Sequence, residues 1–316
     1  MFKNNKLSEI LQDPKPDGKE RPWRPKKVRN LIIADSYKRL GEEKRANRVK
    51  FCGTYLEFTK DTKTGIKFLS GANFCRERLC PMCQWRRSLR AFYEVSTVMD
   101  EVQEKHKNLI PLFFTVTVRN CKAEVPELMK TLDSVFKGWN RFLDIRQIER
   151  TISGWFRGME LTYNKKTDEF HPHIHALILV DKKYFKGSAY METAEWVQYW
   201  RSAMRIDYDP VCDIRRIKNS PQKRKGIAEV AKYTVKDTDF ATADKAFTDR
   251  LVSVLSESLR RRRLYAFGGV MKQIAAKFGA SEDLIKTGDS TIREDVATVI
   301  ERYSWRFGLA NYVKMK

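Results

Sequence analysis

The sequence predicts an α+β protein that is built on an antiparallel sheet with helices on one face. Between residues 111 and 236, strand-like stretches are interleaved with amphipathic helical stretches in the order β-α-β-β-α-β-α. Two neighbouring predicted strands are joined by the turn-forming sequence NKKTDE, which makes them an antiparallel hairpin. The chain has 316 residues, of which 42% are hydrophobic, so it can bury a core of this kind.

Residues 1–50 form the first predicted part, a basic N-terminal arm. This stretch is polar, with prolines at positions 14, 16, 22 and 25, and five of the ten residues from Arg21 to Asn30 are basic. We expect one short helix near Leu31–Leu40. A solvated tail and an arm that contacts DNA both agree with this composition.

Residues 51–107 are predicted to form a small zinc module and the helix that follows it. The sequences TYLEFT (54–59) and IKFLS (66–70) alternate like the strands of a hairpin. Apolar residues then recur three and four positions apart from Trp85 to Val102, which predicts an amphipathic helix.

Four cysteines flank the predicted hairpin. Cys75, Cys80 and Cys83 follow it with the spacing C-x4-C-x2-C, and Cys52 precedes it. Because a hairpin returns its two ends to the same place, the four thiolates can close a tetrahedron around a structural Zn²⁺. The alternative is a set of buried free thiols. The two remaining cysteines, at positions 121 and 212, are expected to pack in or beside strands.

The core is predicted to span residues 108–240. We expect strands at 111–118, 154–163, 171–180 and 211–217, and helices at 125–145, 193–206 and 222–236. This order is that of a ferredoxin-like or RNA-recognition-like core. The last part, residues 241–316, is predicted to be a basic helical C-terminal region that includes the run Arg260–Arg263.

The net charge of +22 favours a polyanionic partner, either a nucleic acid or an acidic membrane surface. The apolar runs are too short to span a bilayer, and the N-terminus lacks the apolar stretch of a signal peptide. We therefore expect a cytoplasmic protein with reduced cysteines and a nucleic acid as its partner. Candidate contacts with DNA are the basic residues around the cysteine cluster and on the last core helix: Arg76, Arg78, Arg86, Arg87, Arg90, Lys232 and Lys236.

Three of the four histidines of the chain, His171, His173 and His175, alternate along one predicted strand and therefore share a face of the sheet. If the hairpin turn is centred near residues 166–167, Glu160 lies opposite His173 on that face. A carboxylate with two imidazoles and open positions suits Mg²⁺ or Mn²⁺ acting on a phosphate. A register slip of one residue would put Glu160 on the other face.

The predicted helix 222–236 carries a second candidate group. Its apolar stripe contains Ile227 and Val230, while Gly226, Glu229, Tyr233 and Lys236 fall on the opposite side. A tyrosine hydroxyl is a poor nucleophile at its ordinary pKa, and the neighbouring lysines favour its phenolate. The alternatives are a surface tyrosine and a glutamate that only orders the helix through a lysine pair.

These motifs resemble the HUH endonucleases, which carry a histidine-hydrophobic-histidine strand followed by a helix with a tyrosine. The segments GMELTYN, HPHIHALI and EVAKYTVKDTD, together with C-x4-C-P-M-C, more narrowly resemble the Rep initiators of rolling-circle plasmids of Gram-positive bacteria. The resemblance runs from about Cys52 to about Gly269, and it implies an HUH core.

In such proteins one tyrosine nicks one strand at the double-strand origin, stays joined to the 5′-phosphate and leaves a 3′-OH primer. By resemblance, Tyr233 would be the nucleophile, Glu229 the residue that activates water, and His173 and His175 the metal ligands. The role of His171, which lies outside the pair, stays open. The implied partners are plasmid origin DNA and the host helicase and polymerase, and self-association stays open.

Three other functions remain as alternatives. The sequence HPHIHAL also fits the pattern of the histidine-triad nucleotide hydrolases, in which His173 would be the nucleophile. A zinc-containing DNA-binding protein without catalysis would use the histidine strand only structurally. A transposase or relaxase would apply the same chemistry to another substrate.

Overall fold

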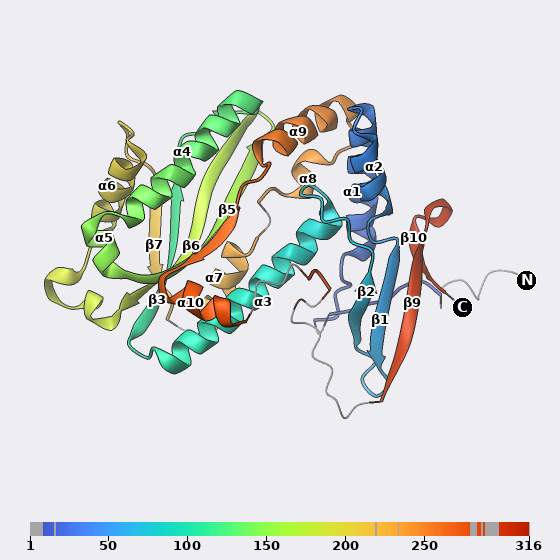
Figure 1. Ribbon diagram of the computed structural model, residues 1–316, viewed down its shortest axis with the longest axis horizontal. Coiled ribbons are helices and arrows are strands. Elements are labelled where there is room, and N and C mark those ends of the chain that lie inside the picture. Colours follow the sequence, from blue (N-terminus) through green and yellow to red (C-terminus); the bar gives the residue numbers. More distant parts are fainter. Residues whose placement is uncertain are drawn as a thin grey trace, which may run out of the picture. The chain divides into compact units, whose positions relative to one another are not determined.

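The structure is a computed structural model that describes residues 9–15, 17–218, 220–232, 234–278, 283–285, 287 and 297–315. Its chain divides into two compact units (Figure 1). Unit 1 comprises Met1–Arg90, Asp237–Ser253 and Glu282–Lys316, and unit 2 comprises Ala91–Lys236 and Val254–Ser281. The predicted four-part division of the chain stays a prediction. Within the described residues, no helix has the length and apolar character needed to cross a membrane.

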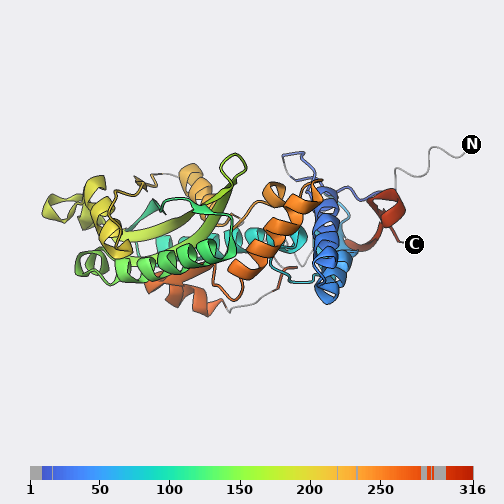
Figure 2. The ribbon, with the colours of Figure 1, turned by 90° about the horizontal axis from the view of Figure 1, so that it is seen from above.

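Unit 2 contains a six-stranded sheet with the strand order β7-β3-β6-β5-β8, to which β4 adds by pairing with β6. Every pairing is antiparallel, so the predicted α+β class with an antiparallel sheet is confirmed. The centre of the sheet is the long hairpin β5–β6, whose turn extends past the neighbouring strands (Figure 2). The strands are β3 (Leu109–Thr117), β4 (Cys121–Lys122), β5 (Ile152–Asn164), β6 (Glu169–Asp181), β7 (Cys212–Arg216) and β8 (Tyr265–Gly268).

Helices cover both faces of this sheet, whereas the sequence predicted helices on one face. The neighbouring residues Phe113 and Phe114 of β3 point to opposite faces. Phe113 belongs to a buried cluster with residues of α3, α7 and α10, while Phe114 contacts Trp139 of α4 and Trp196 of α6. The difference arises because the helix after the cysteines contributes its apolar stripe to the second face. The helices are α3 (Pro81–Lys105), α4 (Val125–Leu143), α5 (Arg146–Thr151), α6 (Thr193–Met204), α7 (Ser220–Val230) and α10 (Gly269–Lys277), with the short 3₁₀ helices η1 (Lys182–Phe185) and η2 (Gly187–Ala189).

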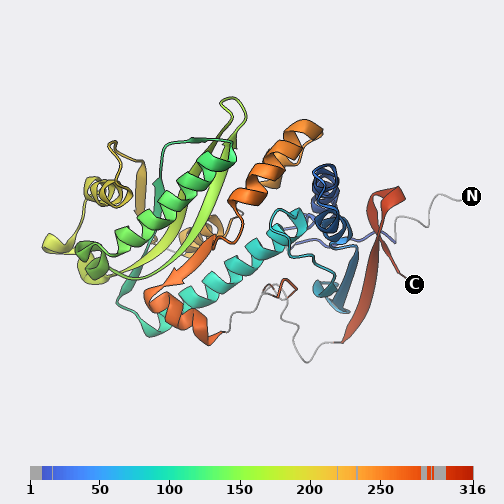
Figure 3. The same ribbon diagram turned by 45° about the horizontal axis from the view of Figure 1, so that its top comes forward.

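Unit 1 combines helices with a four-stranded antiparallel sheet of order β10-β9-β1-β2. Figure 3 shows the red C-terminal strands beside the blue N-terminal hairpin, where β1 pairs with β9 along seven residues from Tyr55 to Asp61. The elements are α1 (Trp23–Arg39), α2 (Glu43–Phe51), β1 (Tyr55–Asp61), β2 (Lys67–Ala72), α8 (Asp237–Phe240), α9 (Lys245–Ser258), β9 (Thr298–Arg306), η3 (Phe307–Leu309) and β10 (Asn311–Lys314). The boundary between the two units falls within α3 and within α9.

Two expectations about the ends of the chain are corrected. The region 241–316 is not helical throughout, because it supplies β8 to one sheet and β9 and β10 to the other. The basic stretch from Arg21 to Arg29 is largely part of α1, and its side chains bind partners inside the fold. Lys26 and Arg29, for example, contact the buried carboxylate of Asp237 at 2.9 and 2.7 Å.

The predicted helix 222–236 also ends earlier than expected, at Val230. The backbone beyond it bonds to the sheet, since the N–H of Leu161 donates to the carbonyl of Thr234 at 2.6 Å. Gly226 lies on the buried side of α7, where an added Cβ would contact Ile217, Leu177 and Phe113, and not on the polar side.

Candidate functional site

Glu160, His173 and His175 converge on the face of the unit 2 sheet that packs against α7. Glu160 pairs directly with His173 across the hairpin, so the register expected from the turn is confirmed. Nε2 of His173 lies 3.3 Å, and Nε2 of His175 3.0 Å, from the same carboxylate oxygen of Glu160. One donor atom from each residue lies within 4.8 Å of the others, and the residues are only 7–9% exposed. Two imidazoles and one carboxylate in this arrangement can hold one divalent cation.

The charged state of Glu160 is favoured by its neighbours. Burial raises the pKa of this carboxyl, but the hydrogen bonds of His173 and His175 outweigh that effect and lower the pKa well below its usual range. Glu160 is therefore ionised at neutral pH and available as a ligand.

Further groups contact the Nδ1 atoms of the two histidines and orient their rings. Nδ1 of His175 lies 2.9 Å from Oγ1 of Thr115 on β3, and Nδ1 of His173 lies 3.1 Å from the carbonyl oxygen of His171. The ring of His171 itself contacts Oδ1 of Asn120 at 2.7 Å and does not belong to the ligand group. Such outer contacts fix the tautomer and direction of a metal-binding imidazole. The sequence interpretation missed Thr115 and Asn120, because only the pairings of β3 and β4 with β6 bring them to the histidines.

Glu229 reaches the same group from the last turn of α7. Its Oε1 lies 3.7 Å from Nε2 of His175 and also forms an ion pair with Lys232. The end of α7 lies very close to β5, since a Cβ added at Gly158 would come within 2.3 Å of the carbonyl oxygen of Val230.

Tyr233 lies outside the described residues, so the structure does not place the expected nucleophile. The chain on both sides of it is described. Lys232 precedes it and contacts Glu229, and Thr234 follows it and bonds to Leu161, the neighbour of Glu160.

Cys52, Cys75, Cys80 and Cys83 form the second candidate metal centre, in unit 1. Their sulfur atoms all lie within 4.8 Å of one another, and three of the Sγ–Sγ distances are 3.5, 3.7 and 3.5 Å. A tetrahedron of thiolates around Zn²⁺ has Sγ–Sγ separations of about 3.8 Å, whereas a disulfide bond is about 2 Å long. The four cysteines therefore fit a zinc ion.

Polar groups around this cluster also fit thiolate sulfur. The backbone N–H groups of Cys75 and Arg76 donate to the sulfurs of Cys52 and Cys83 at 3.3 and 3.2 Å. Asn30 of α1 donates to the sulfur of Cys80 at 3.2 Å. Each such bond stabilises negative charge on sulfur.

A buried lysine adds positive charge next to the cysteines. The ammonium of Lys27 donates to the carbonyl of Cys52 at 2.7 Å and to Oδ1 of Asn30 at 2.9 Å. Burial lowers the pKa of Lys27 to about 8, against the attraction of the four cysteines. This cation would offset part of the charge that four thiolates retain around one zinc ion.

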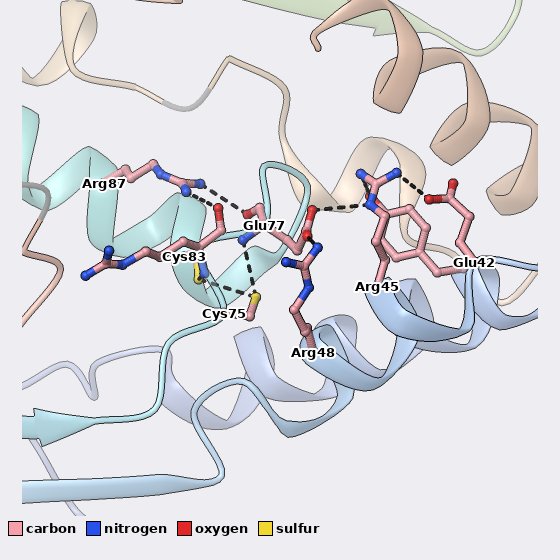
Figure 4. A network of polar contacts seen from close by, with 9 residues as sticks. Glu42, Arg45, Arg48, Cys75, Glu77, Cys83 and Arg87 are labelled. Atoms are coloured by element: carbon pink, nitrogen blue, oxygen red, sulfur yellow. Dashed lines mark hydrogen bonds and ion pairs between the residues drawn. The ribbon is translucent and has the colours of Figure 1, made fainter. Parts of the chain in front are cut away.

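Figure 4 shows the outer side of the cluster, where Glu77 connects α2 to the cysteine loop. The backbone N–H of Glu77 donates to the sulfur of Cys75 at 3.4 Å, and its carboxylate pairs with Arg45 at 3.3 Å and with Arg48. Arg87 donates to the carbonyl of Glu77 at 3.2 Å.

The candidate DNA contacts differ in accessibility. Arg86 is 4% exposed and donates to the carbonyls of Leu284 and Ile285 at 2.8 and 2.7 Å, so the expected contact of Arg86 with DNA is corrected to a structural role. With Oγ1 of Thr287 as a third acceptor at 2.9 Å, these hydrogen bonds offset the cost of burying a basic residue there. The other candidates lie at least partly at the surface: Arg76, Arg78, Arg87, Arg90, Lys232 and Lys236.

The two remaining cysteines lie in strands, as expected, and outside both candidate metal groups. Cys121 is buried in β4, and burial raises the pKa of its thiol. Burial raises the pKa of Cys212, in β7, to about 12. Both stay protonated at neutral pH and do not act as thiolates.

Comparisons with known proteins give one consistent result. A family model described as replication protein matches residues 66–313. The protein named Protein rep of Bacillus amyloliquefaciens is 33% identical over 341 residues, with 99% of both chains covered. Protein rep of Streptococcus pneumoniae is 33% identical over 321 residues, which cover 99% of this chain and 98% of the relative. No solved structure matches.

Proposed function

Since the chain belongs to the Rep family of replication proteins that initiate rolling-circle replication of plasmids, we propose that it nicks one strand of the plasmid origin with the residues gathered on the unit 2 sheet. The observation that carries this proposal is the group of Glu160, His173 and His175, with Glu229 next to it. A metal-dependent nickase needs such a group beside a nucleophile, whereas a DNA-binding protein without catalysis does not.

In the proposed reaction, the phenolic oxygen of Tyr233 attacks a backbone phosphorus. A bond forms between that oxygen and phosphorus, and the bond to the 3′-oxygen breaks. The phenol loses its proton and the departing 3′-oxygen gains one, which leaves a 5′-phosphotyrosine and a free 3′-OH. A bound Mg²⁺ or Mn²⁺ supplies Lewis-acid polarisation of the phosphate. The 3′-OH then serves as primer for a host polymerase.

Two observations support this role of Tyr233. Lys232, its neighbour, is ion-paired with Glu229, and Thr234 is hydrogen-bonded to the strand residue after Glu160. The residues before and after the tyrosine are thereby tied to Glu229 and to the strand that carries Glu160.

Glu229 is proposed to act in the final step, in which water releases the covalently bound strand end. Its carboxylate lies 3.7 Å from His175 and can take a proton from a water beside the same phosphate. The ion pair with Lys232 also fits a purely structural role, so the function of Glu229 needs its own test.

The test is covalent capture. The full chain is incubated with a labelled single-stranded oligonucleotide from the origin of its plasmid and Mn²⁺, and the denatured products are separated by size. We expect an adduct with the natural chain and with the control Tyr190→Phe. This control removes the hydroxyl of an exposed tyrosine that directly follows η2. Tyr233→Phe should lower adduct formation by more than a hundredfold without loss of DNA affinity.

The same assay examines the remaining residues. Glu160→Gln and His173→Gln should each abolish adduct formation, whereas Glu229→Gln should form the adduct at a normal rate but fail to release it. An adduct that persists in Tyr233→Phe would assign the nucleophile to another residue. Normal release by Glu229→Gln would leave Glu229 with only its ion pair to Lys232.

A further inference from the structure

Two large aromatic side chains lie exposed together in unit 1, next to a lysine, and an exposed leucine follows in the same turn as one of them. We call Lys50, Phe51, Phe307 and Leu309 the aromatic–cation patch. Phe51 is 51%, Phe307 47% and Leu309 60% exposed. Phe51 ends α2, and the other two apolar residues belong to the turn η3 between β9 and β10. Exposed aromatic groups gathered at one place mark a binding surface.

The two rings and the lysine form one compact arrangement. The ring centroids of Phe51 and Phe307 are 6.4 Å apart, with their planes at 81°. The ammonium of Lys50 lies 5.9 Å from the first centroid and 5.8 Å from the second. Among the described residues, Lys50 has no carboxylate within ion-pair distance, so its charge is available to a ligand.

The backbone beneath the patch is held by the cysteine module. Lys27 donates to the carbonyl of Lys50 at 2.6 Å, and Asn73 donates to that of Phe51 at 2.8 Å. The next residue is the candidate zinc ligand Cys52. On the other side, Nε of Arg24 donates to the carbonyl of Ala310 at 2.9 Å and fixes the end of the turn. The backbone that carries the two rings is therefore already ordered before a ligand binds. This order lowers the entropy cost of binding.

We propose that the aromatic–cation patch binds single-stranded DNA, with an unpaired base stacked on Phe51 or Phe307 and a backbone phosphate next to Lys50. Every base has an aromatic face, so stacking tolerates any sequence, and a nearby cation complements the phosphate. The net charge of +22 favours a nucleic acid over an acidic peptide as the occupant because it attracts long polyanions most strongly. The proposal rests on the proposed function only in taking DNA as ligand, since the nicking residues lie in unit 2.

The experiment measures the affinity of the full, zinc-loaded chain for a labelled 20-nucleotide single strand by fluorescence anisotropy, with no Mg²⁺ or Mn²⁺ so that no cleavage occurs. Phe51→Ala and Phe307→Ala together should weaken binding by on the order of tenfold to a hundredfold. Phe51→Trp should bind at least as tightly as the natural chain. The control Ile300→Ala removes a side chain of similar exposure, 54%, from β9 of the unit 1 sheet. It should leave the affinity for the single strand unchanged.

Two further measurements identify the chemistry. An oligonucleotide whose bases are replaced by abasic sites should bind the natural chain and the double variant equally. Lys50→Gln should make the dependence of affinity on salt shallower by about one unit of slope. Zinc content and thermal unfolding of each variant show whether unit 1 remains folded.

Three results would overturn the proposal. The double variant could bind the normal strand within twofold of the natural chain. It could weaken binding of the abasic strand by the same factor as the normal one, in which case no base is stacked. It could leave DNA affinity intact but change the sedimentation coefficient, in which case the occupant is a second copy of the chain. Adduct formation at saturating DNA by the double variant reports separately on the nicking residues of unit 2.

Discussion

The imidazole of His175 has two nitrogens with different partners. Nε2 lies at the carboxylate of Glu160, while Nδ1 lies 2.9 Å from the hydroxyl of Thr115. If a cation occupies the side of Nε2, the proton of the ring must be on Nδ1, and the oxygen of Thr115 is its acceptor. Thr115 is therefore a positioning residue, which acts through His175 and does not touch the phosphate.

We expect Thr115→Val to weaken Mn²⁺ binding by roughly tenfold or more, because it keeps the shape of the side chain but removes the acceptor. Titration of the full chain with Mn²⁺, followed by electron paramagnetic resonance, measures this affinity. Thr115→Ser keeps the hydroxyl and should restore the affinity to within a few-fold. Equal affinities for the valine and serine variants would show that the contact does not orient His175.

At the level of single residues, the candidate sites were largely predictable where the ligands are close in sequence. Alternation along one strand and one hairpin turn sufficed to bring Glu160 to His173 and His175. Thr115 could not be predicted in the same way, since its place beside His175 depends on a strand pairing that spans sixty residues of sequence. The burial of Arg86 also could not be predicted from the sequence, because its hydrogen-bond acceptors belong to residues nearly two hundred positions away.

Among the elements, α7 and β5 meet with little free space. Gly158 pairs with His175 in the sheet, and its Cα faces the carbonyl of Val230. Any side chain there would push the end of α7, and Glu229 with it, away from the histidines. A shift of about 1 Å in a reacting group can reduce the rate by about a hundredfold.

Gly158→Ala should therefore slow hydrolytic release of the adduct by on the order of a hundredfold, while adduct formation and most of the affinity for Mn²⁺ are retained. The rates of adduct formation and release and the Mn²⁺ affinity are measured on the same sample. Gly226→Ala is the matched control within α7, because its added Cβ would meet only side-chain atoms at 3.2–3.6 Å. A Gly158→Ala chain that releases the adduct at the normal rate would contradict the positioning of Glu229 by this contact.

The helices and strands themselves were predictable to different degrees. The hairpin β5–β6 agrees with its expected range because apolar residues are continuous along β6 and the turn is polar. The helix 222–236 was extended too far, since its helical spacing continues past Val230 while the backbone leaves to bond with β5. The periodicity of side chains along a helix does not predict a backbone hydrogen bond to a distant strand.

At the scale of the whole chain, Glu301 connects all four strands of the unit 1 sheet. This β9 carboxylate lies 2.8 Å from the ammonium of Lys314 on β10, 2.9 Å from that of Lys67 on β2 and 3.6 Å from that of Lys60 on β1. Burial raises the pKa of Glu301, but the hydrogen bonds from Lys314, Lys67 and Tyr303 outweigh it and lower the pKa from 4.5 to about 2.

A carboxyl whose pKa is lowered on folding stabilises the fold above its unfolded pKa, and this contribution disappears as the pH falls toward the folded pKa. The free energy of unfolding should therefore decrease between pH 5 and pH 2, by about 3 kcal/mol at most from this group. Glu301→Gln should be less stable than the natural chain at pH 7, and the difference should shrink toward pH 2.

Urea unfolding at a series of pH values measures this difference. Glu57→Gln is the control, because Glu57 lies on the neighbouring strand β1 but is more exposed and pairs with Arg302 at 2.8 Å. Its effect on stability should stay below about 1 kcal/mol. A constant difference between Glu301→Gln and the natural chain from pH 7 to pH 2 would contradict the assigned role of Glu301.

The long-range organisation was the least predictable part of the fold. In β9, Glu301, Tyr303 and Trp305 are buried at alternating positions, which is a strand pattern, but Val299 and Ile300 are exposed and obscure it. Nothing local indicates that this strand belongs beside β1. The class of the core could be predicted because its strands are interleaved with helices along the chain.

The pairing of β1 with β9 joins residues as far apart in sequence as Glu57 and Arg302, whose side chains bond across 245 positions. On a ribosome, the cysteine hairpin therefore emerges long before the strand that completes its sheet. The residues of unit 2, which end at Ser281, have all been synthesised by then. The order usual in translation, in which the N-terminal part folds first, is thus reversed here. A chain released early would carry the complete histidine group but a cysteine hairpin whose strand β1 lacks its partner β9.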